Sequence, residues 1–212
     1  MASFVIAIDG PAGSGKSSVS KAVAKALGFG YLDTGAGYRS FALHKLANPD
    51  LPLEHLIANF DYEISLDPTS QFMSLAGADV TAEIRGEKAA AAVSQIAREP
   101  MVRQLQLEDA RTRISSCDLP GIVVEGRDIT TVVAPDADLR ILLTASEDVR
   151  LKRRGLEQTE SAENLKARDE SDSKVVEFFS PADGVVLIDT SDLDFEASVM
   201  AVLEKVKAVQ NG

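Results

Sequence analysis

The sequence predicts a three-layer α/β fold in which about five parallel strands form the central sheet. Short apolar runs alternate with helical patterns, and such runs are typical of strands buried on both faces. The runs are "FVIAID", "GYLDTG", "GIVVEG", "LRILLTA" and "GVVLID". A glycine-rich loop between the first run and a helical pattern supports the same fold class.

The first strand, the loop and the first helix follow one another directly. Residues 4–9 form a short apolar run with β-branched members, and glycine and proline end it. Apolar residues then recur at helical spacing as far as Leu27, and Gly28 is a suitable stop. The segment therefore has the strand–loop–helix context that a phosphate-binding loop requires.

Residues 10–17 (the P-loop) fit the spacing G-x-x-x-x-G-K-[ST], a pattern that wraps a polyphosphate. Its backbone N–H groups point at phosphate oxygens, and Gly13 and Gly15 permit that close approach. Lys16 places a charge on the β- and γ-phosphates, while the Ser17 hydroxyl ligates Mg²⁺. The predicted ATP-binding residues are Gly10, Pro11, Ala12, Gly13, Ser14, Gly15, Lys16, Ser17 and Ser18.

Two stretches interrupt the alternation of strands and helices. Residues 61–85 alternate and turn in a way that predicts a small antiparallel insert. Helical patterns follow at 89–96 and 102–114, with Pro100 as the break between them. The second stretch, 149–172, begins as a helix that Ser146 could cap and then becomes strongly polar, which predicts a mobile segment.

Composition narrows the function classes. The 212 residues suffice for one domain with inserts, and the net charge of −11 disfavours a nucleic-acid surface. No apolar run approaches the ~18 residues that span a bilayer. Residues 1–10 lack a basic leader, which favours a strand over a signal peptide. Cys117 has no second cysteine to pair with, so we expect a reducing, cytoplasmic location.

An anionic ligand on so acidic a chain needs a local cluster of arginines. Arg39 and Arg127 each follow a predicted strand, at the sheet edge where ligands of open α/β sheets bind. These two arginines predict a second phosphate site beside the P-loop. Arg150, Arg153 and Arg154 share one helix face. An ordinary solvated face explains this set equally well.

Motifs along nearly the whole chain resemble those of bacterial cytidylate kinases, which phosphorylate CMP and dCMP with ATP. They are "IDGPAGSGKSS", "YLDTGAGYR", "DVTAEIR", "VSQIAREPMVR", "VVEGRDITTVVAPDADLRILLTAS" and "RDESDS". The "GRD" and "DVTAEIR" motifs distinguish this family from adenylate and shikimate kinases. The resemblance implies a P-loop kinase fold with a five-stranded parallel sheet, an NMP-binding insert and a lid. We expect a single domain over 1–212, with core segments 1–58, 98–148 and 176–212, the insert at 59–97 and the lid at 149–175.

The resemblance also implies roles for individual residues. Arg39 and Arg127 bind the acceptor phosphate, and Arg150 and Arg154 are lid arginines that close over the donor phosphates. The implied CMP-binding set is Thr34, Arg39, Ser94, Arg103, Arg127, Asp128, Arg168 and Asp172. Catalysis is implied for Lys16, Arg39, Arg127, Arg150 and Arg154.

The chemistry of cytosine agrees with the implied base contacts. Asp128 can accept from the N4 amino group, while Arg103 and Ser94 donate to N3 and O2. Uracil reverses the polarity at two of these atoms, and a buried mismatch of that kind costs ~1–3 kcal/mol. A structural salt bridge is the alternative role for Asp128.

The chain departs from the family pattern near its lid. Val175 stands where the family commonly has an arginine, with Lys174 beside it, and the segment 154–168 is short. These changes affect the third phosphate-binding arginine and leave the base-reading set intact.

The sequence thus predicts a (d)CMP kinase that uses ATP and Mg²⁺, and the resemblance implies a monomer. Since the acceptor phosphate is already anionic, no general base is needed, and His44 and His55 receive no catalytic role. Asp33 either bears on the Mg²⁺ shell, positions Thr34, or serves a structural turn. Two alternatives stay open: a P-loop kinase for another small acceptor such as UMP or AMP, and a nucleotide-binding protein with little phosphotransfer.

Overall fold

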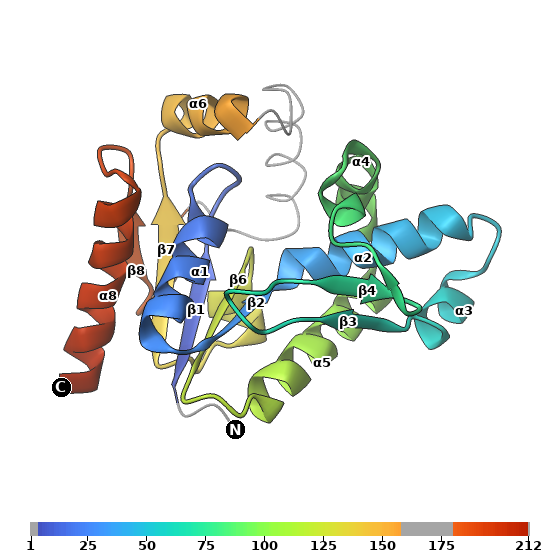
Figure 1. Ribbon diagram of the computed structural model, residues 1–212, viewed down its shortest axis with the longest axis horizontal. Helices are drawn as coiled ribbons and strands as arrows, with labels where there is room; N and C mark the ends of the chain where they lie inside the picture. Colours follow the sequence, from blue (N-terminus) through green and yellow to red (C-terminus); the bar gives the residue numbers. More distant parts are fainter. Residues whose placement is uncertain (1–3, 158–179, 212) are drawn as a thin grey trace.

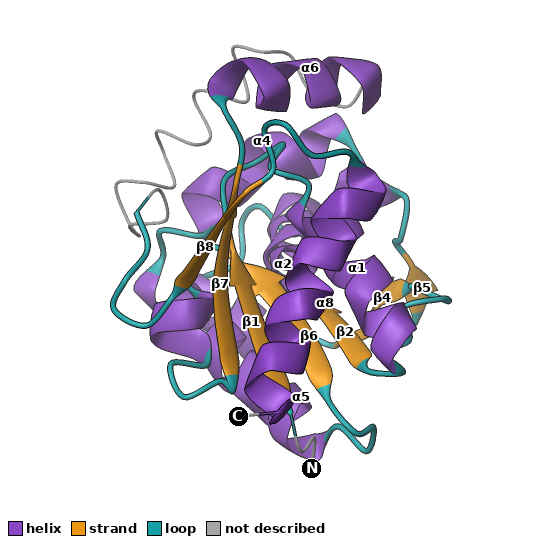
Figure 2. Cartoon of the chain, turned by 90° about the vertical axis from the view of Figure 1, so that its left-hand side faces the viewer, coloured by secondary structure: helices purple, strands orange, loops and turns teal. Residues whose placement is uncertain are grey.

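Five parallel strands form the central sheet, in the order β2-β6-β1-β7-β8 (Figures 1 and 2). The computed structural model describes residues 4–157 and 180–211, and side chains for 4–153 and 180–211. The strands are β1 Val5–Asp9, β2 Gly30–Asp33, β6 Ile122–Gly126, β7 Leu139–Thr144 and β8 Val186–Asp189. All five match the apolar runs of the sequence, so the predicted parallel sheet is confirmed.

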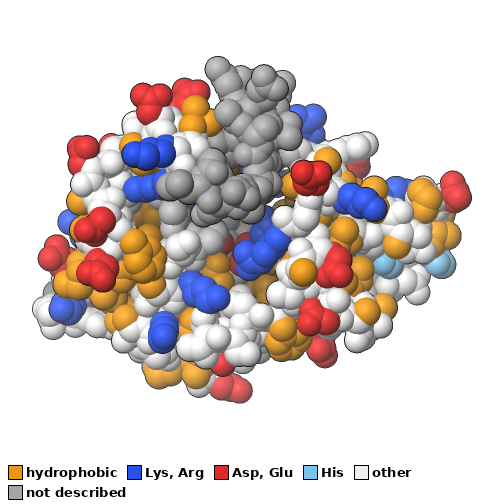
Figure 3. Space-filling model, turned by 45° about the horizontal axis from the view of Figure 1, so that its top comes forward, with side chains coloured by type: hydrophobic (Ala, Val, Ile, Leu, Met, Phe, Trp, Pro, Cys, Tyr) orange, Lys and Arg blue, Asp and Glu red, His pale blue; other side chains and the backbone are white. Residues whose placement is uncertain are grey.

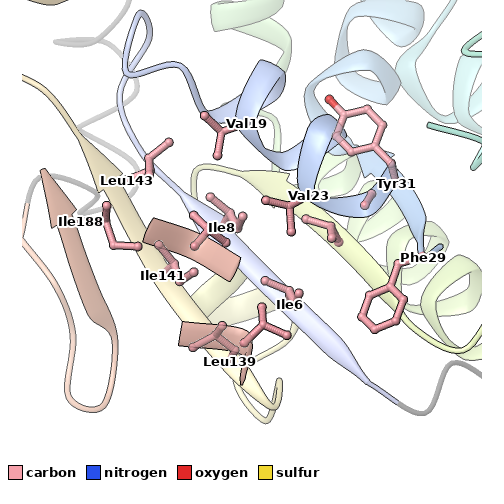
Figure 4. Close-up of a cluster of buried hydrophobic side chains, with 14 residues drawn as sticks. Ile6, Ile8, Val19, Val23, Phe29, Tyr31, Leu139, Ile141, Leu143 and Ile188 are labelled. Atoms are coloured by element: carbon pink, nitrogen blue, oxygen red, sulfur yellow. The ribbon is translucent and has the colours of Figure 1, made fainter. Parts of the chain in front are cut away.

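Helices cover both faces of this sheet. Figure 2 shows α1 (Lys16–Leu27) and α8 (Phe195–Asn211) on one face, while α2 (Thr34–Ala47) and α5 (Pro100–Ser116) pack on the other. In β1, Ile6 and Ile8 point into the core under α1 and α8 (Figure 4), whereas Ala7 belongs to the opposite core. Burial on both faces explains why the strands lack polar alternation.

The predicted antiparallel insert is a three-stranded sheet of β3 (Tyr62–Ile64), β4 (Met73–Leu75) and β5 (Ala78–Asp79). A 3₁₀ turn, η1 (Glu83–Arg85), and helix α4 (Glu87–Ile96) follow it. Together with α3 (Leu53–Ala58), α4 packs on α2 around a separate core that includes Phe41, Leu56 and Val93. Pro100, expected as a break, is the first residue of α5, where its missing N–H costs nothing.

Helix α6 (Glu147–Glu157) lies above the P-loop in Figure 1. It crosses the predicted boundary between core and lid at 148/149. The remainder of the predicted lid lies outside the described residues, and the domain boundaries stay predictions. Within the described ranges, the structure contains no helix that combines the length and apolar character of a membrane span.

One buried carboxylate joins the first strand to the turn after β6. Asp9 ends β1, is 3% exposed, and accepts from the backbone N–H groups of Ile129 and Thr130, both at 2.8 Å. The Thr130 hydroxyl donates to the same side chain at 2.6 Å. Burial raises the pKa of Asp9, and these hydrogen bonds oppose the rise. The side chain thereby fixes η2 (Ile129–Val133), a short π-helical turn.

The Asp9→Ala substitution is expected to lower the free energy of unfolding by about 3 kcal/mol, because three buried donors lose their acceptor. Urea denaturation measures this loss. Asp138→Ala is the matched control, since the exposed Asp138 carboxylate accepts one hydrogen bond, from Val5 N at 2.7 Å. Equal losses in the two variants would contradict a special role for Asp9.

Candidate active site

The P-loop connects β1 to α1 and depends on its glycines for packing as well as for ligand approach. Gly13 and Gly15 have φ angles of 78° and 88°, in the left-handed region that glycine adopts at no steric cost. A Cβ at Gly10 would lie 2.1 Å from the Leu143 carbonyl oxygen, and one at Gly13 would lie 2.8 Å from that of Arg150. The loop is therefore held tightly between β7 and α6.

Lys16 and Ser17 open α1 at the end of the loop. The Lys16 ammonium lies 3.5 Å from the Pro11 carbonyl oxygen, on the loop itself. Ser17 Oγ donates to Glu125 Oε1 at 2.6 Å. The two residues assigned to phosphate and Mg²⁺ thus stand at the N-terminus of a helix, where the helix dipole also favours anions.

Glu125 contacts the predicted Mg²⁺ ligand Ser17, and the sequence analysis assigned it no role. It lies on β6, is 2% exposed, and also accepts from the Tyr31 hydroxyl at 3.1 Å. Burial and the nearby Asp33 carboxylate raise its pKa, while Lys16 and the Ser17 hydrogen bond lower it. The available signal was a single carboxylate at the end of the apolar run "GIVVEG". Such a group is expensive to bury without a cation.

The arginines predicted for the acceptor phosphate follow neighbouring strands: Arg39 lies in the second turn of α2, after β2, and Arg127 directly follows β6. Asp33 ends β2, caps α2 by accepting from Ala36 N at 3.1 Å, and holds Arg39 Nη2 at 2.9 Å. Asp33 therefore serves α2 and Arg39 at once. The buried Arg39 Nε has no hydrogen-bond partner within the described part of the chain. Arg127 follows β6 and donates to the Gly10 carbonyl at 3.2 Å, which ties it to the P-loop.

A pocket of about 370 Å³ opens between α2, α5 and η2. Its polar lining includes Thr34, Tyr38, Arg103, Gln106 and Asp128. Arg103 Nη2 pairs with Asp128 Oδ2 at 2.7 Å, and Thr34 Oγ1 donates to a backbone carbonyl of β6. Burial and the Asp128 charge raise the pKa of Tyr38 to about 12. The pocket therefore offers a paired cation and anion beside Tyr38 and apolar residues such as Leu107 and Val133.

The structure brings part of the predicted acceptor set together. Thr34, Arg103 and Asp128 line the pocket. Ser94 is half-buried on α4 and is not among the residues that line it. Arg168 and Asp172, like Lys174 and Val175, lie outside the described residues.

Among the helical arginines whose side chains the structure describes, Arg150 and Arg153 both contact the P-loop. Arg150 Nη1 donates to the Ala12 carbonyl at 3.0 Å. Arg153 donates to the carbonyl oxygens of Ser14, Thr190 and Leu193 and to the Thr190 hydroxyl, at 2.9–3.3 Å. Arg153 therefore fastens α6 to the loop and to the end of β8 instead of belonging to a solvated face. The Arg154 side chain lies outside those described. Figure 3 views the molecule with the top of Figure 1 turned forward, and it shows basic side chains beside a hollow near the centre of that surface.

A phosphate-binding loop and a second cationic site on one edge of a parallel sheet define a phosphotransferase of the P-loop kinase class. The fold agrees with this class. A gluconokinase from Sinorhizobium meliloti superposes with a TM-score of 0.53 at 16% identity, covering 99% of this chain and 98% of that one.

The particular family follows from the whole sequence. The family model described as cytidylate kinase matches residues 6–208, and the chain belongs to this family. A cytidylate kinase of Rhodococcus opacus is 41% identical over 210 residues, covering 92% of this chain and 90% of the relative. One from Thermotoga petrophila is 40% identical over 220 residues, covering 98% and 99%.

The Glu125→Gln substitution is expected to lower kcat about 10- to 100-fold and to raise the Mg²⁺ concentration needed for half-maximal rate, because it removes the charge beside Ser17. The amide can still accept from Tyr31, so thermal unfolding should change little. Initial rates over a Mg²⁺ titration measure the effect. Glu63→Gln, on the exposed part of β3, is the control. An unchanged Mg²⁺ dependence in Glu125→Gln would contradict a role for Glu125 in Mg²⁺ binding beside Ser17.

Proposed function

We propose that the protein transfers the γ-phosphate of ATP to CMP, and to dCMP, giving ADP and CDP or dCDP. The observation that carries the proposal is the Arg103–Asp128 pair in a pocket next to the strand end that bears Arg127. Such a pair offers a donor and an acceptor side by side, as the edge of cytosine requires. The relatives named cytidylate kinase, at about 40% identity over most of the chain, support the same acceptor.

The base-reading step uses groups that the structure already orients. Asp128 accepts from the N4 amino group, and Arg103 donates to N3 or O2. Their mutual contact of 2.7 Å holds both side chains before the nucleotide arrives, so less rotamer entropy is lost on binding. With UMP, Asp128 would face a carbonyl oxygen, and two buried acceptors would repel each other.

The phosphoryl-transfer step consists of positioning and charge stabilisation. A phosphate oxygen of CMP is the nucleophile and is already anionic, so no side chain has to remove a proton. Arg39, oriented by Asp33, and Arg127, tied to Gly10, hold this phosphate in line with the P-loop. Lys16 balances the charge that spreads over the transferring group, and Arg150 lies on the loop from the α6 side.

The residues at the loop suit a magnesium ion. Ser17 Oγ and the Glu125 carboxylate provide oxygen ligands beside each other, and a buried carboxylate near Asp33 is a favourable neighbour for a divalent cation. Ser17 would hold the ion, and the Glu125 carboxylate, which accepts from the Ser17 hydroxyl, would add a negative charge close to it. When bound, Mg²⁺ neutralises the charge of the β- and γ-phosphates.

Several features of the proposal rest on the family resemblance alone. These are the ribose contacts of Arg168 and Asp172, the closing role of Arg154, base contact by Ser94 and the monomeric state; the cytoplasmic location rests on the single cysteine, Cys117. Each stays a prediction.

An acceptor panel tests the proposal. ADP release is measured with Mg²⁺-ATP and either CMP, dCMP, UMP or AMP. CMP and dCMP should give the highest kcat/KM, with UMP at least about tenfold lower because of the mismatch at Asp128. Lys16→Ala is expected to cut turnover about 100-fold or more with every acceptor.

Two results would contradict the proposal. One is a preference for UMP or AMP. The other is near-normal turnover in Lys16→Ala, which would remove the P-loop from the reaction. Circular dichroism of Lys16→Ala checks that the fold is intact.

A further inference from the structure

Arg111 lies on α5 and donates to the last two carbonyl oxygens of the π-helical turn η2. Its Nε atom lies 3.1 Å from the Val133 oxygen, and its Nη2 atom lies 2.8 Å from the Val132 oxygen. The last carbonyls of a helical turn lack partners within the turn. A guanidinium suits them, because its donors form a rigid fork and its charge is attracted to the negative end of the turn.

The hydrogen bonds within η2 follow the rare π-helical pattern. Val133 N donates to the Asp128 carbonyl at 3.1 Å, and Ala134 N donates to that of Ile129 at 2.8 Å. Turns of this kind occur mostly as single turns and are frequent at functional sites. Asp128 is the N-cap of η2, so the residue that faces the base opens the turn whose far end Arg111 holds.

Two arginines of α5 contact opposite ends of η2. Arg103 pairs with Asp128 at the start of the turn, at 2.7 Å, and Arg111 binds its end. The two arginines are eight positions apart, which is about 12 Å along the helix. Both elements line the acceptor pocket between these contacts, with Leu107 and Ala110 from α5 and Val132 and Val133 from η2. The spacing of α5 and η2 therefore sets the width of the pocket.

Arg113, two positions further along α5, provides a contrast. Its Nε atom donates to Asp109 Oδ2 at 2.7 Å, and its guanidinium carbon lies 4.9 Å from the centre of the Tyr62 ring. Asp109 and Tyr62 are not among the residues that line the pocket. Arg113 thus joins α5 to the antiparallel insert, whereas Arg111 joins it to η2.

We propose that Arg111 is a positioning residue for base recognition, which holds the end of η2 on α5 and thereby keeps Asp128 aligned with Arg103. This inference rests on the proposed function, since Arg111 acts through Asp128 and is assigned no contact with the nucleotide. Asp9 fixes the first residues of η2, so the turn is held at both ends. Loss of the far contact should misalign the base-reading pair and leave the P-loop in place.

The test compares Arg111→Met with the wild type in steady-state kinetics, with CMP or UMP varied and Mg²⁺-ATP saturating. Methionine keeps much of the length of the side chain but donates no hydrogen bond. KM for CMP should rise about three- to tenfold. The CMP-to-UMP ratio of kcat/KM should fall about threefold or more, because a displaced Asp128 discriminates less. KM for ATP and kcat with CMP should stay within about twofold.

Two further variants and one measurement without nucleotide sharpen the comparison. Arg111→Lys keeps the charge and can donate to one carbonyl, so its KM for CMP should lie between those of Arg111→Met and the wild type. Arg113→Met is the matched control and should leave the CMP-to-UMP ratio unchanged. Amide hydrogen exchange at Val133 and Ala134 should be faster in Arg111→Met than in the wild type, since η2 has lost a partner.

The outcomes separate this inference from the proposed function. An unchanged CMP-to-UMP ratio in Arg111→Met, whether or not its unfolding midpoint falls, would overturn the role of Arg111 and leave the proposed function intact. Equal effects in Arg111→Met and Arg113→Met would also overturn it, because a general weakening of α5 would explain both. Unchanged hydrogen exchange would overturn it as well. A wild type without CMP-dependent turnover would contradict the proposed function itself.

Discussion

The hydrogen bonds that the buried Asp9 carboxylate accepts hold the two halves of the site in one frame. Asp9 is the last residue before the P-loop, and its partners Ile129 and Thr130 begin the turn just after Arg127 and Asp128. Arg127 adds a second link between the same two segments, because its guanidinium donates to the Gly10 carbonyl oxygen in the P-loop. Donor and acceptor groups are therefore fixed to the ends of adjacent parallel strands, β1 and β6, so the positions of the two phosphates depend on the sheet more than on loops.

The edge of the sheet that carries the P-loop gathers arginines, although the chain as a whole is strongly acidic. The protein carries a net charge of −11, yet it has to bind two polyanions. Two carboxylates orient the cations that face these anions: Asp33 pairs with Arg39, and Asp128 pairs with Arg103. Each acid lowers the local positive field but fixes a guanidinium in place. Under the proposed function, orientation of a few donors, rather than a broad basic surface, is thus the basis of phosphate and base binding.

Much of the fold and part of the site could be predicted because their signals are local. Strands buried on both faces appear as continuous apolar runs, and the P-loop is a motif within a single strand–loop–helix unit. Glu125 was missed since its meaning depends on Ser17, 108 residues away in the chain.

The central claim is that Asp128, oriented by Arg103, selects cytosine. Its most direct test is the ratio of kcat/KM for CMP to that for UMP in Asp128→Asn. The amide keeps the shape of the side chain but can donate to the uracil carbonyl, so we predict that the ratio falls about tenfold or more. A ratio equal to that of the wild type would contradict the claim, because the base would then be read elsewhere.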